Sequence, residues 1–285
     1  SVVNAGAATW GNGTIGSTGT VTVTNSLVGS TANDNVGFNG VTALSNGNYV
    51  VRSINWDNGS AVNAGAVTWG NGMTGSTGTV TVTNSLVGST TNDAVGGSVA
   101  ILSNGNYVID AYNWDNGSAV NAGAVIWGNG TTGSTGTISA ANSLVGSTTE
   151  DKVGFYGTVA LSNGNYVVSN VNWDNGSAVN AGAVTWGNGT TGITGAVSAA
   201  NSLVGSTAED KVGSGGVTRL SNGNYVVRAS SWDNSSVVDA GAITWGDGTL
   251  GVRGRLSPHN SLVGTVTSAG SFLNVVENTL QPYLA

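Results

Sequence analysis

Short runs of alternating apolar and polar residues, separated by turn sequences, recur along the whole chain. In one such stretch, residues 41–45 and 48–52 are rich in Val, Thr and Tyr and flank Asn46-Gly47. Asn-Gly between two β-prone runs favours a type I′ turn, in which both central residues have positive φ. The pattern predicts an antiparallel hairpin, and no window shows the 3.6-residue period of a helix.

Two more strands are predicted after this hairpin. A loop at residues 55–63 leads into residues 64–69, which we expect to form a third strand ending at Trp69. Thr and Gly alternate with Val over residues 77–83, which predicts a fourth strand. One unit is therefore about four antiparallel strands long, and residues 84–96 lead to the next unit.

The unit recurs five times, with spacings of 58 or 59 residues between equivalent positions. Trp-Gly-Asn/Asp-Gly and Asn-Ser-Leu-Val-Gly each occur five times, whereas Leu-Ser-Asn-Gly-Asn-Tyr-Val and Trp-Asp-Asn each occur four times. Periods of this length are typical of propellers, solenoids and related arrays. The tryptophans of the first motif, which we expect in the core between units, are Trp10, Trp69, Trp127, Trp186 and Trp245.

We expect an all-β fold, a five-bladed β-propeller of about four antiparallel strands per blade that forms a single domain over residues 1–285. The chain starts in mid-unit, and residues 271–285 fall where a fifth hairpin would be. We expect this tail to pair with the N-terminal strands, complete the last blade and close the ring, which would remove two open sheet edges. A β-solenoid is the alternative, although solenoid strands are parallel and lack tight Asn-Gly reversals.

Composition and charge narrow the possible partners. The chain has a net charge of −7 and only seven basic residues, so we expect no nucleic-acid partner. No apolar run reaches the roughly 18 residues of a membrane helix, so we expect no membrane insertion. There is no Cys, which excludes a disulfide framework. If the ring closes, we expect a monomer.

Several long motifs carry a resemblance to a known class of repeats. They are Leu-Ser-Asn-Gly-Asn-Tyr-Val-Val, Asn-Trp-Asp-Asn-Gly, Asn-Ala-Gly-Ala-Val-Thr-Trp-Gly-Asn-Gly-Thr-Thr-Gly and Asn-Ser-Leu-Val-Gly-Ser. Over about residues 1–265 the chain resembles the tandem propeller-like repeats of very large bacterial proteins of the haemagglutinin and adhesin type. The resemblance implies an extracellular or cell-surface location within a larger bacterial protein, and a binding role toward glycans or surface proteins. It implies no catalytic residues.

The candidate binding residues lie in the loop after the hairpin, where a Trp stands beside Asp and Asn. An indole face can stack on a sugar ring while its polar neighbours bond the hydroxyls, which makes a multivalent lectin the alternative to a scaffold or adhesion module. The same composition would suit a well-anchored loop between blades. These residues are Trp56, Asp57, Trp114, Asp115, Trp173, Asp174, Trp232 and Asp233.

We expect no enzyme and no cofactor. His259 is the only His and there is no Cys, which disfavours zinc. An active site occurs once, whereas the acidic residues recur in every unit, so repetition favours structure or multivalent binding. Calcium in the oxygen-rich Asn-Trp-Asp-Asn-Gly-Ser loop is the alternative to an Asx-turn. A second recurring set of acids includes Asp151 and Asp210, which we expect to be solvated loop charges.

The units differ from one another at two places. The position after the second strand holds Arg52, Asp110, Ser169 and Arg228, and the segment before the first strand carries Phe38, Phe155 and Tyr156. Drift on an exposed surface explains such variation. The alternative is one asymmetric binding face built around the three aromatic residues.

Overall fold

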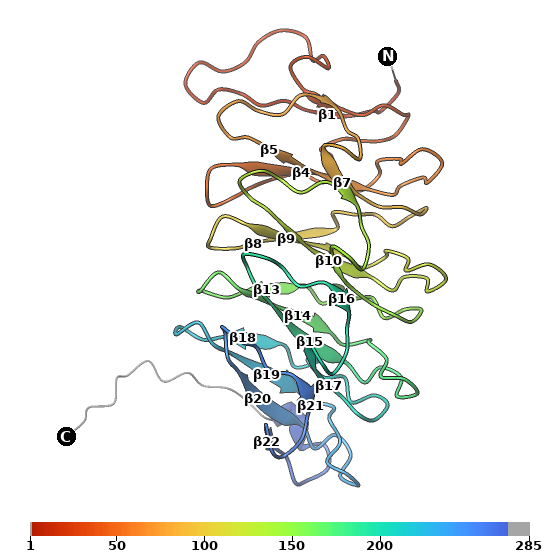
Figure 1. Cartoon of the computed structure of the whole chain (residues 1–285), viewed down its shortest axis with the longest axis vertical. Helices are drawn as coiled ribbons and strands as arrows, with labels where there is room; N and C mark the ends of the chain where they lie inside the picture. Colours follow the sequence, from red (N-terminus) through yellow and green to blue (C-terminus); the bar gives the residue numbers. More distant parts are fainter. Residues whose placement is uncertain (1, 273–285) are drawn as a thin grey trace, which may run out of the picture.

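The structure, a computed structural model, describes residues 2–272. It is all-β, with five small sheets that follow one another along the long axis of the molecule (Figure 1). The antiparallel strands of each sheet and the loops between them form one layer. The layers, numbered 1 to 5, comprise residues 2–38, 41–97, 98–155, 158–214 and 217–272. Layer 1 and layer 5 lie at opposite ends of the stack.

Layers 2 to 5 each contain a four-stranded antiparallel meander and one additional two-residue strand. Layer 1 contains β1 (Ala7–Ala8) and β2 (Leu27–Val28). Layer 2 contains β3 (Val41–Ala43), β4 (Tyr49–Ser53), β5 (Ala66–Gly70), β6 (Gly78–Thr79) and β7 (Ser85–Val87). Layer 3 contains β8 (Ser98–Ile101), β9 (Tyr107–Ala111), β10 (Ala124–Gly128), β11 (Gly136–Thr137) and β12 (Leu144–Val145).

The last two layers repeat this arrangement. Layer 4 contains β13 (Thr158–Ala160), β14 (Tyr166–Asn170), β15 (Ala183–Gly187), β16 (Gly195–Ala196) and β17 (Ser202–Val204). Layer 5 contains β18 (Val217–Arg219), β19 (Tyr225–Ala229), β20 (Ala242–Gly246), β21 (Gly254–Arg255) and β22 (Leu262–Val263), followed by the 3-10 turn η1 (Ala269–Phe272).

The predicted hairpin is confirmed, but its turn is of a different type. Strands β3 and β4 pair antiparallel around Asn46-Gly47. Gly47 has a φ of 86°, whereas Asn46 is absent from the residues with positive φ, so this is not a type I′ turn. The N–H of Gly47 donates to the carbonyl of Leu44, and the N–H of Leu44 donates to the carbonyl of Asn48. This pattern is that of a three-residue loop with a bulge glycine.

The predicted fourth strand at residues 77–83 is wrong. Only Gly78–Thr79 is a strand there, and the antiparallel neighbour of β5 is instead β7, from the Asn-Ser-Leu-Val-Gly motif. Leu86 and Val87 are 2% and 0% exposed, so this motif buries more apolar surface than the Thr/Gly-rich segment before it. The side chain of Asn84 also bonds the backbone of the preceding segment, which turns the chain toward β7.

The two-residue strands join each layer to the one before it. Strands β6, β11, β16 and β21 pair in parallel with β2, β7, β12 and β17, respectively, and so extend the sheet of the preceding layer. These links run in one direction along the stack. Among the strands of residues 2–272, none from layer 1 pairs with one from layer 5.

The described residues therefore form an open stack and not the predicted closed ring. The expected closure depended on pairing by the tail, of which residues 273–285 lie outside the described part of the chain. Propeller blades and stacked layers both bury two sheet faces against neighbours, so the repeat pattern is compatible with either arrangement. The stack has the linear order of the solenoid alternative, but its layers contain antiparallel hairpins.

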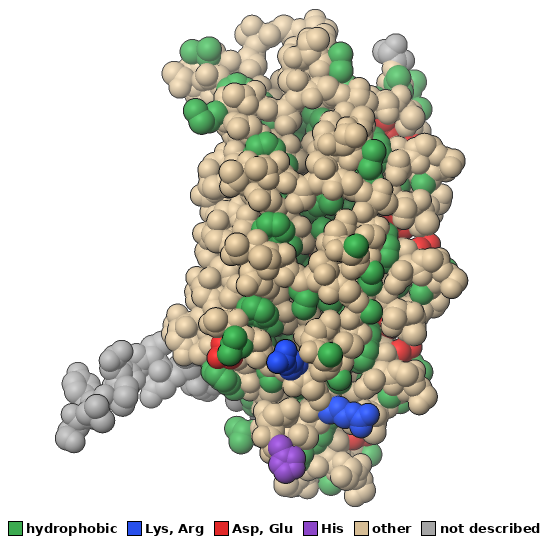
Figure 2. Space-filling view, viewed as in Figure 1, with side chains coloured by type: hydrophobic (Ala, Val, Ile, Leu, Met, Phe, Trp, Pro, Cys, Tyr) green, Lys and Arg blue, Asp and Glu red, His purple; other side chains and the backbone are tan. Residues whose placement is uncertain are grey.

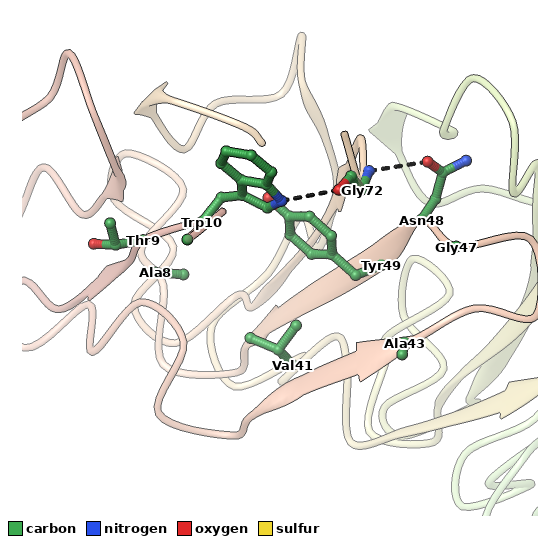
Figure 3. A pocket seen from close by; sticks show the side chains of 10 residues that line it. Ala8, Thr9, Trp10, Val41, Ala43, Gly47, Asn48, Tyr49 and Gly72 are labelled. Atoms are coloured by element: carbon green, nitrogen blue, oxygen red, sulfur yellow. Dashed lines mark hydrogen bonds between the residues drawn. The ribbon is translucent and has the colours of Figure 1, made fainter. Parts of the chain in front are cut away.

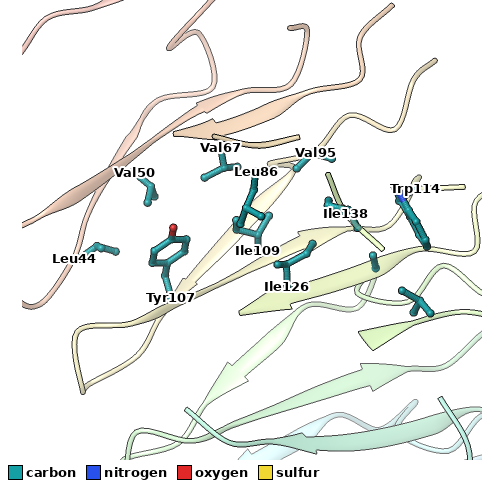
Figure 4. Close-up of a cluster of buried hydrophobic side chains, with 13 residues drawn as sticks. Leu44, Val50, Val67, Leu86, Val95, Tyr107, Ile109, Trp114, Ile126 and Ile138 are labelled. Carbon is teal, nitrogen blue, oxygen red and sulfur yellow. The ribbon is translucent and has the colours of Figure 1, made fainter. Parts of the chain in front are cut away.

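The hydrophobic core lies between consecutive layers. In one cluster Leu44, Val50 and Val67 of layer 2 pack against Tyr107 and Ile109 of layer 3 (Figure 4). Similar clusters join layers 1 and 2, layers 3 and 4, and layers 4 and 5. Each layer thus buries its apolar faces only with its neighbours, as in other repeat arrays.

Glycines of the Trp-Gly-Asn-Gly motif permit close packing within each layer. A Cβ at Gly128 would overlap the ring of Tyr107, which lies on the paired strand β9. A Cβ at Gly130 would overlap the carbonyl oxygen of Gly105, the turn glycine of the hairpin. In layers 2 to 5 the motif and the hairpin therefore fit together, because each occupies space that the other leaves free.

Candidate functional site

The tryptophans of the predicted binding loop are buried. Each is 4% exposed, and Trp114, for example, belongs to the core cluster between layers 2 and 3. No described residue accepts a hydrogen bond from their buried indole N–H groups. In this conformation the ring faces contact the core and are not presented for stacking on a sugar. The four residues are Trp56, Trp114, Trp173 and Trp232.

The aspartate after each of these tryptophans is partly buried and holds its own loop together. Oδ1 of Asp57 accepts a hydrogen bond from the backbone N–H of Asn63 at 2.8 Å. The equivalent bond is 2.8 Å long in the three other layers that carry the loop. The bond spans six residues, so it closes the loop but is not the two-residue Asx-turn expected from the composition. It recurs at Asp115, Asp174 and Asp233.

The second set of acids is buried beside the first. Oδ2 of Asp34 accepts the N–H groups of Ser30 and Thr31 at 2.6 and 2.8 Å. Its Oδ1 accepts the Thr31 hydroxyl at 2.5 Å and the N–H of Asp57 at 3.1 Å. Four donors thus replace the water that this carboxylate loses on burial.

The expectation that Asp151 and Asp210 are solvated loop charges is wrong. They are 1% and 0% exposed, and both make the contacts that Asp34 makes. Their charged neighbours do lie at the surface, where Lys152 and Glu150 form an ion pair at 2.7 Å. The sequence pattern did not separate the buried acid from its exposed neighbours because polar loop residues do not alternate like strand residues.

The structure brings together recurring acids of consecutive layers, since Asp34 of layer 1 lies beside Asp57 of layer 2. Thr31 links them, since its hydroxyl lies 2.5 Å from Oδ1 of Asp34 and 3.4 Å from Oδ2 of Asp57. Within residues 2–272, no group of three His, Cys, Asp or Glu side chains is placed to hold a metal ion. The pairs act as loop anchors in which backbone N–H groups satisfy the carboxylates.

The variable position after the second strand is also structural in two layers. The Arg52 guanidinium donates to the carbonyls of Gly97 and Asn39. Asp110, which is 1% exposed, accepts the Ser98 hydroxyl at 2.6 Å and the Thr158 hydroxyl of layer 4 at 2.8 Å. Burial raises the pKa of Asp110 to about 6, against the opposing effect of these two hydrogen bonds.

Two of the three aromatic residues proposed for an asymmetric face come together. The ring centroid of Phe155 lies 5.2 Å from that of Tyr156 and 5.3 Å from that of Tyr112, both in edge-to-face geometry. The sequence pattern did not indicate Tyr112, which follows β9. Phe38 lies in layer 1, and 78% of it is exposed. The aromatic group thus lies where layer 3 leads into layer 4, and the Tyr156 hydroxyl donates to Oδ1 of Asn172 in layer 4.

A cavity of about 450 Å³ opens between layers 1 and 2 (Figure 3). Its walls include Trp10 of layer 1 and Val41 and Tyr49 of layer 2. The indole N–H of Trp10 donates to the carbonyl of Gly72 at 3.0 Å across this junction. At the next junction the hairpin of layer 2 packs against layer 3.

A family model described as a repeat of unknown function (DUF5650) matches residues 1–38, 43–97, 101–155, 160–214 and 219–271. The chain belongs to this family. The five DUF5650 matches coincide with the five layers, which confirms the tandem repeats. No curated protein matches the chain. No helix within residues 2–272 is long and apolar enough to cross a membrane.

Proposed function

We propose that this array of DUF5650 repeats is a non-enzymatic scaffold or adhesion module of a bacterial surface or secreted protein. The supporting observation is that its recurring acidic side chains hold loops in place through hydrogen bonds to the backbone. Asp34 and Asp57, and their equivalents, bond backbone N–H groups in layer after layer. Carboxylates committed in this way hold loops in place and are not free to act as acid and base.

The linear order of the layers also supports this function. Repeat arrays that stack in one direction present equivalent surfaces at regular spacing, which suits binding to extended or multivalent targets. The resemblance to adhesin-type repeats favours a cell surface as that target. A rigid stack would serve equally as a spacer for other parts of a larger protein.

A multivalent glycan-binding role is the second candidate. Figure 2 shows acidic side chains spaced along one edge of the stack. Asp57, Asp115 and Asp174 are only partly buried and occupy equivalent places in successive layers. Since the loop tryptophans are buried, we expect any glycan contact in these loops to depend on the polar groups.

The functional test is binding by beads coated densely with the chain. We expect the scaffold or adhesion module to attach to a bacterial or host cell surface in proportion to coating density, with no turnover of soluble substrates. The same beads on a glycan array, with calcium and with chelator, distinguish the glycan candidate. Turnover of a soluble substrate that is lost in Asp57→Asn or Asp110→Asn would contradict a non-enzymatic role.

A further inference from the structure

Within residues 2–272, the two ends of the stack carry matching parts of the interface that joins each layer to the next: a strand edge with a tryptophan at one end, and a strand segment with glycines at the other. We propose that the layer 5 face of one copy binds the layer 1 face of a second copy, so that the chain assembles head to tail. This inference goes beyond the proposed scaffold function and does not depend on which surface the scaffold recognises.

The first part of the internal interface is a short parallel strand pair. Leu27 and Val28 of β2 pair with Gly78 and Thr79 of β6, and the N–H of Val80 then donates to the carbonyl of Val28 at 3.0 Å. Val80 is 1% exposed as a result. The same pairing recurs at all four junctions, where the residues equivalent to Val80 are 2–3% exposed: Ile138, Val197 and Leu256.

The second part is a tryptophan that packs on a glycine of the next layer. A Cβ at Gly133 would lie 2.8 Å from the Cβ of Trp69, so only glycine leaves room for this contact. The indole N–H of Trp69 donates to the carbonyl of Gly130 at 2.9 Å. The contact recurs with the same geometry for Trp10, Trp127 and Trp186.

The layer 5 face carries the strand edge and the tryptophan of this interface, and no later layer covers it within residues 2–272. Its sheet ends at β22 and, unlike those of layers 2 to 4, gains no fifth strand among the described residues. Leu262 of β22 is 77% exposed, whereas its equivalent Leu86 is 2% exposed. Trp245 is 54% exposed, whereas the equivalent tryptophans of layers 2 to 4 are partly buried.

The layer 1 face has the complementary strand segment and glycines but, among the described residues, no equivalent of Val51 and Trp56, which layer 2 contributes to its junction with layer 1. Residues 19–21, which correspond to residues 78–80, form no strand, and Val21 is 55% exposed. Gly13 and Gly16 correspond to Gly72 and Gly75, the glycines that Trp10 contacts. A Cβ at Gly13 or Gly16 would meet no atom within 4 Å, so the space that a tryptophan occupies at the internal junctions is open here.

The strand pair and the tryptophan–glycine contact of the four internal junctions indicate how two copies would fit together. Leu262 and Val263 of one copy would pair in parallel with Gly19 and Thr20 of the other, and Val21 would become buried. Trp245 would cover Gly16. Because this contact joins different surfaces and the described layers do not return toward layer 1, it would continue into an open filament. The proposal thus predicts a concentration-dependent assembly, in contrast to the monomer expected from a closed ring.

The test is sedimentation velocity of the full chain over a wide range of protein concentration. The wild-type chain should form dimers and longer species as concentration rises. Trp245→Ala and Val21→Arg should each weaken association by about tenfold or more, because each removes a central buried contact. Tyr156→Ala and Val120→Arg are the matched controls, since these residues are 51% and 48% exposed and lie in the middle of the stack, away from both end faces.

A mixture of the two end variants tests direction. Trp245→Ala keeps an intact layer 1 face and Val21→Arg keeps an intact layer 5 face, so the mixture should form a one-to-one dimer and no longer species. Circular dichroism would verify that each variant is folded. A wild-type chain that stays monomeric at every concentration, or variants that associate like the wild type, would overturn the proposal. Dimers of either variant alone at wild-type affinity would also overturn it.

Discussion

Asp110 allows the energetics of the layer interface to be tested through pH. It is 1% exposed and faces hydroxyl groups of Ser98 and Thr158, with no cationic side chain among its hydrogen-bond partners. Burial raises its pKa from 3.8 to about 6. One unit of pKa corresponds to about 1.4 kcal/mol, so ionising Asp110 in the folded chain costs about 3 kcal/mol.

The direction of the pH dependence follows from the raised pKa. Between pH 3.8 and about 6 the folded chain holds a proton on Asp110 that the unfolded chain has released. The free energy of unfolding contributed by this group is therefore highest below pH 3.8 and falls as pH rises through about 6. Asp110→Asn keeps a similar shape and cannot ionise, so we expect it to remove this loss.

Urea denaturation at a series of pH values from 4 to 8 measures the effect. Asp110→Asn should be more stable than the wild type at pH 7, by up to about 3 kcal/mol, and should match it more closely at pH 4. Asp110→Ser, which introduces the residue found at the equivalent Ser169, separates loss of charge from loss of volume. A variant with the wild-type pH dependence, or one less stable than the wild type at pH 7, would refute the reasoning.

Substitutions at three further positions test the packing of single layers. Gly128→Ala should lower stability by about 1–3 kcal/mol, because its Cβ would overlap the ring of Tyr107; thermal denaturation measures this, and an unchanged melting temperature would contradict the predicted overlap. Trp114→Ala should cost about 3–5 kcal/mol in urea denaturation, whereas Trp114→Phe should cost much less, because it also removes an indole N–H without an acceptor; equal losses would argue against this account. Asp93→Ala should cost about 1–3 kcal/mol or more, since it leaves the buried backbone donors of Ser89 and Thr90 without an acceptor, and faster amide exchange there would locate the loss.

The sequence predicted the features that local pattern determines. Asn46-Gly47 marked the hairpin, and the repeated motifs marked the units that the family matches confirm. The pattern misplaced the fourth strand because residues 77–83 alternate like a strand, yet pair with a different layer over only two residues. Pairing between layers depends on contacts between units, which the period of one unit does not encode.

The sequence identified which residues recur in the candidate site, but not their burial or their hydrogen-bond partners. The sequence grouped Trp56 with Asp57, and the structure places the ring in the core and the carboxylate on backbone N–H groups. Burial of Asp34 was not evident because its four donors come from the surrounding loop and from Asp57 itself. The ring was predicted because both a ring and a stack satisfy the same interface between neighbouring units.

The central claim, an open stack in place of a ring, is tested most directly by Förster energy transfer between layers 1 and 5. The chain has no Cys, so Thr14→Cys with Thr249→Cys supplies the only two thiols for dyes at equivalent exposed turns. Packed sheets lie about 10 Å apart, so four junctions should separate these dyes by about 40 Å. Thr14→Cys with Met73→Cys, in adjacent layers, is the control for close dyes. We expect clearly lower transfer for the first pair than for the control at dilute concentration, whereas equal transfer in both pairs would show that layers 1 and 5 are neighbours and contradict the open stack.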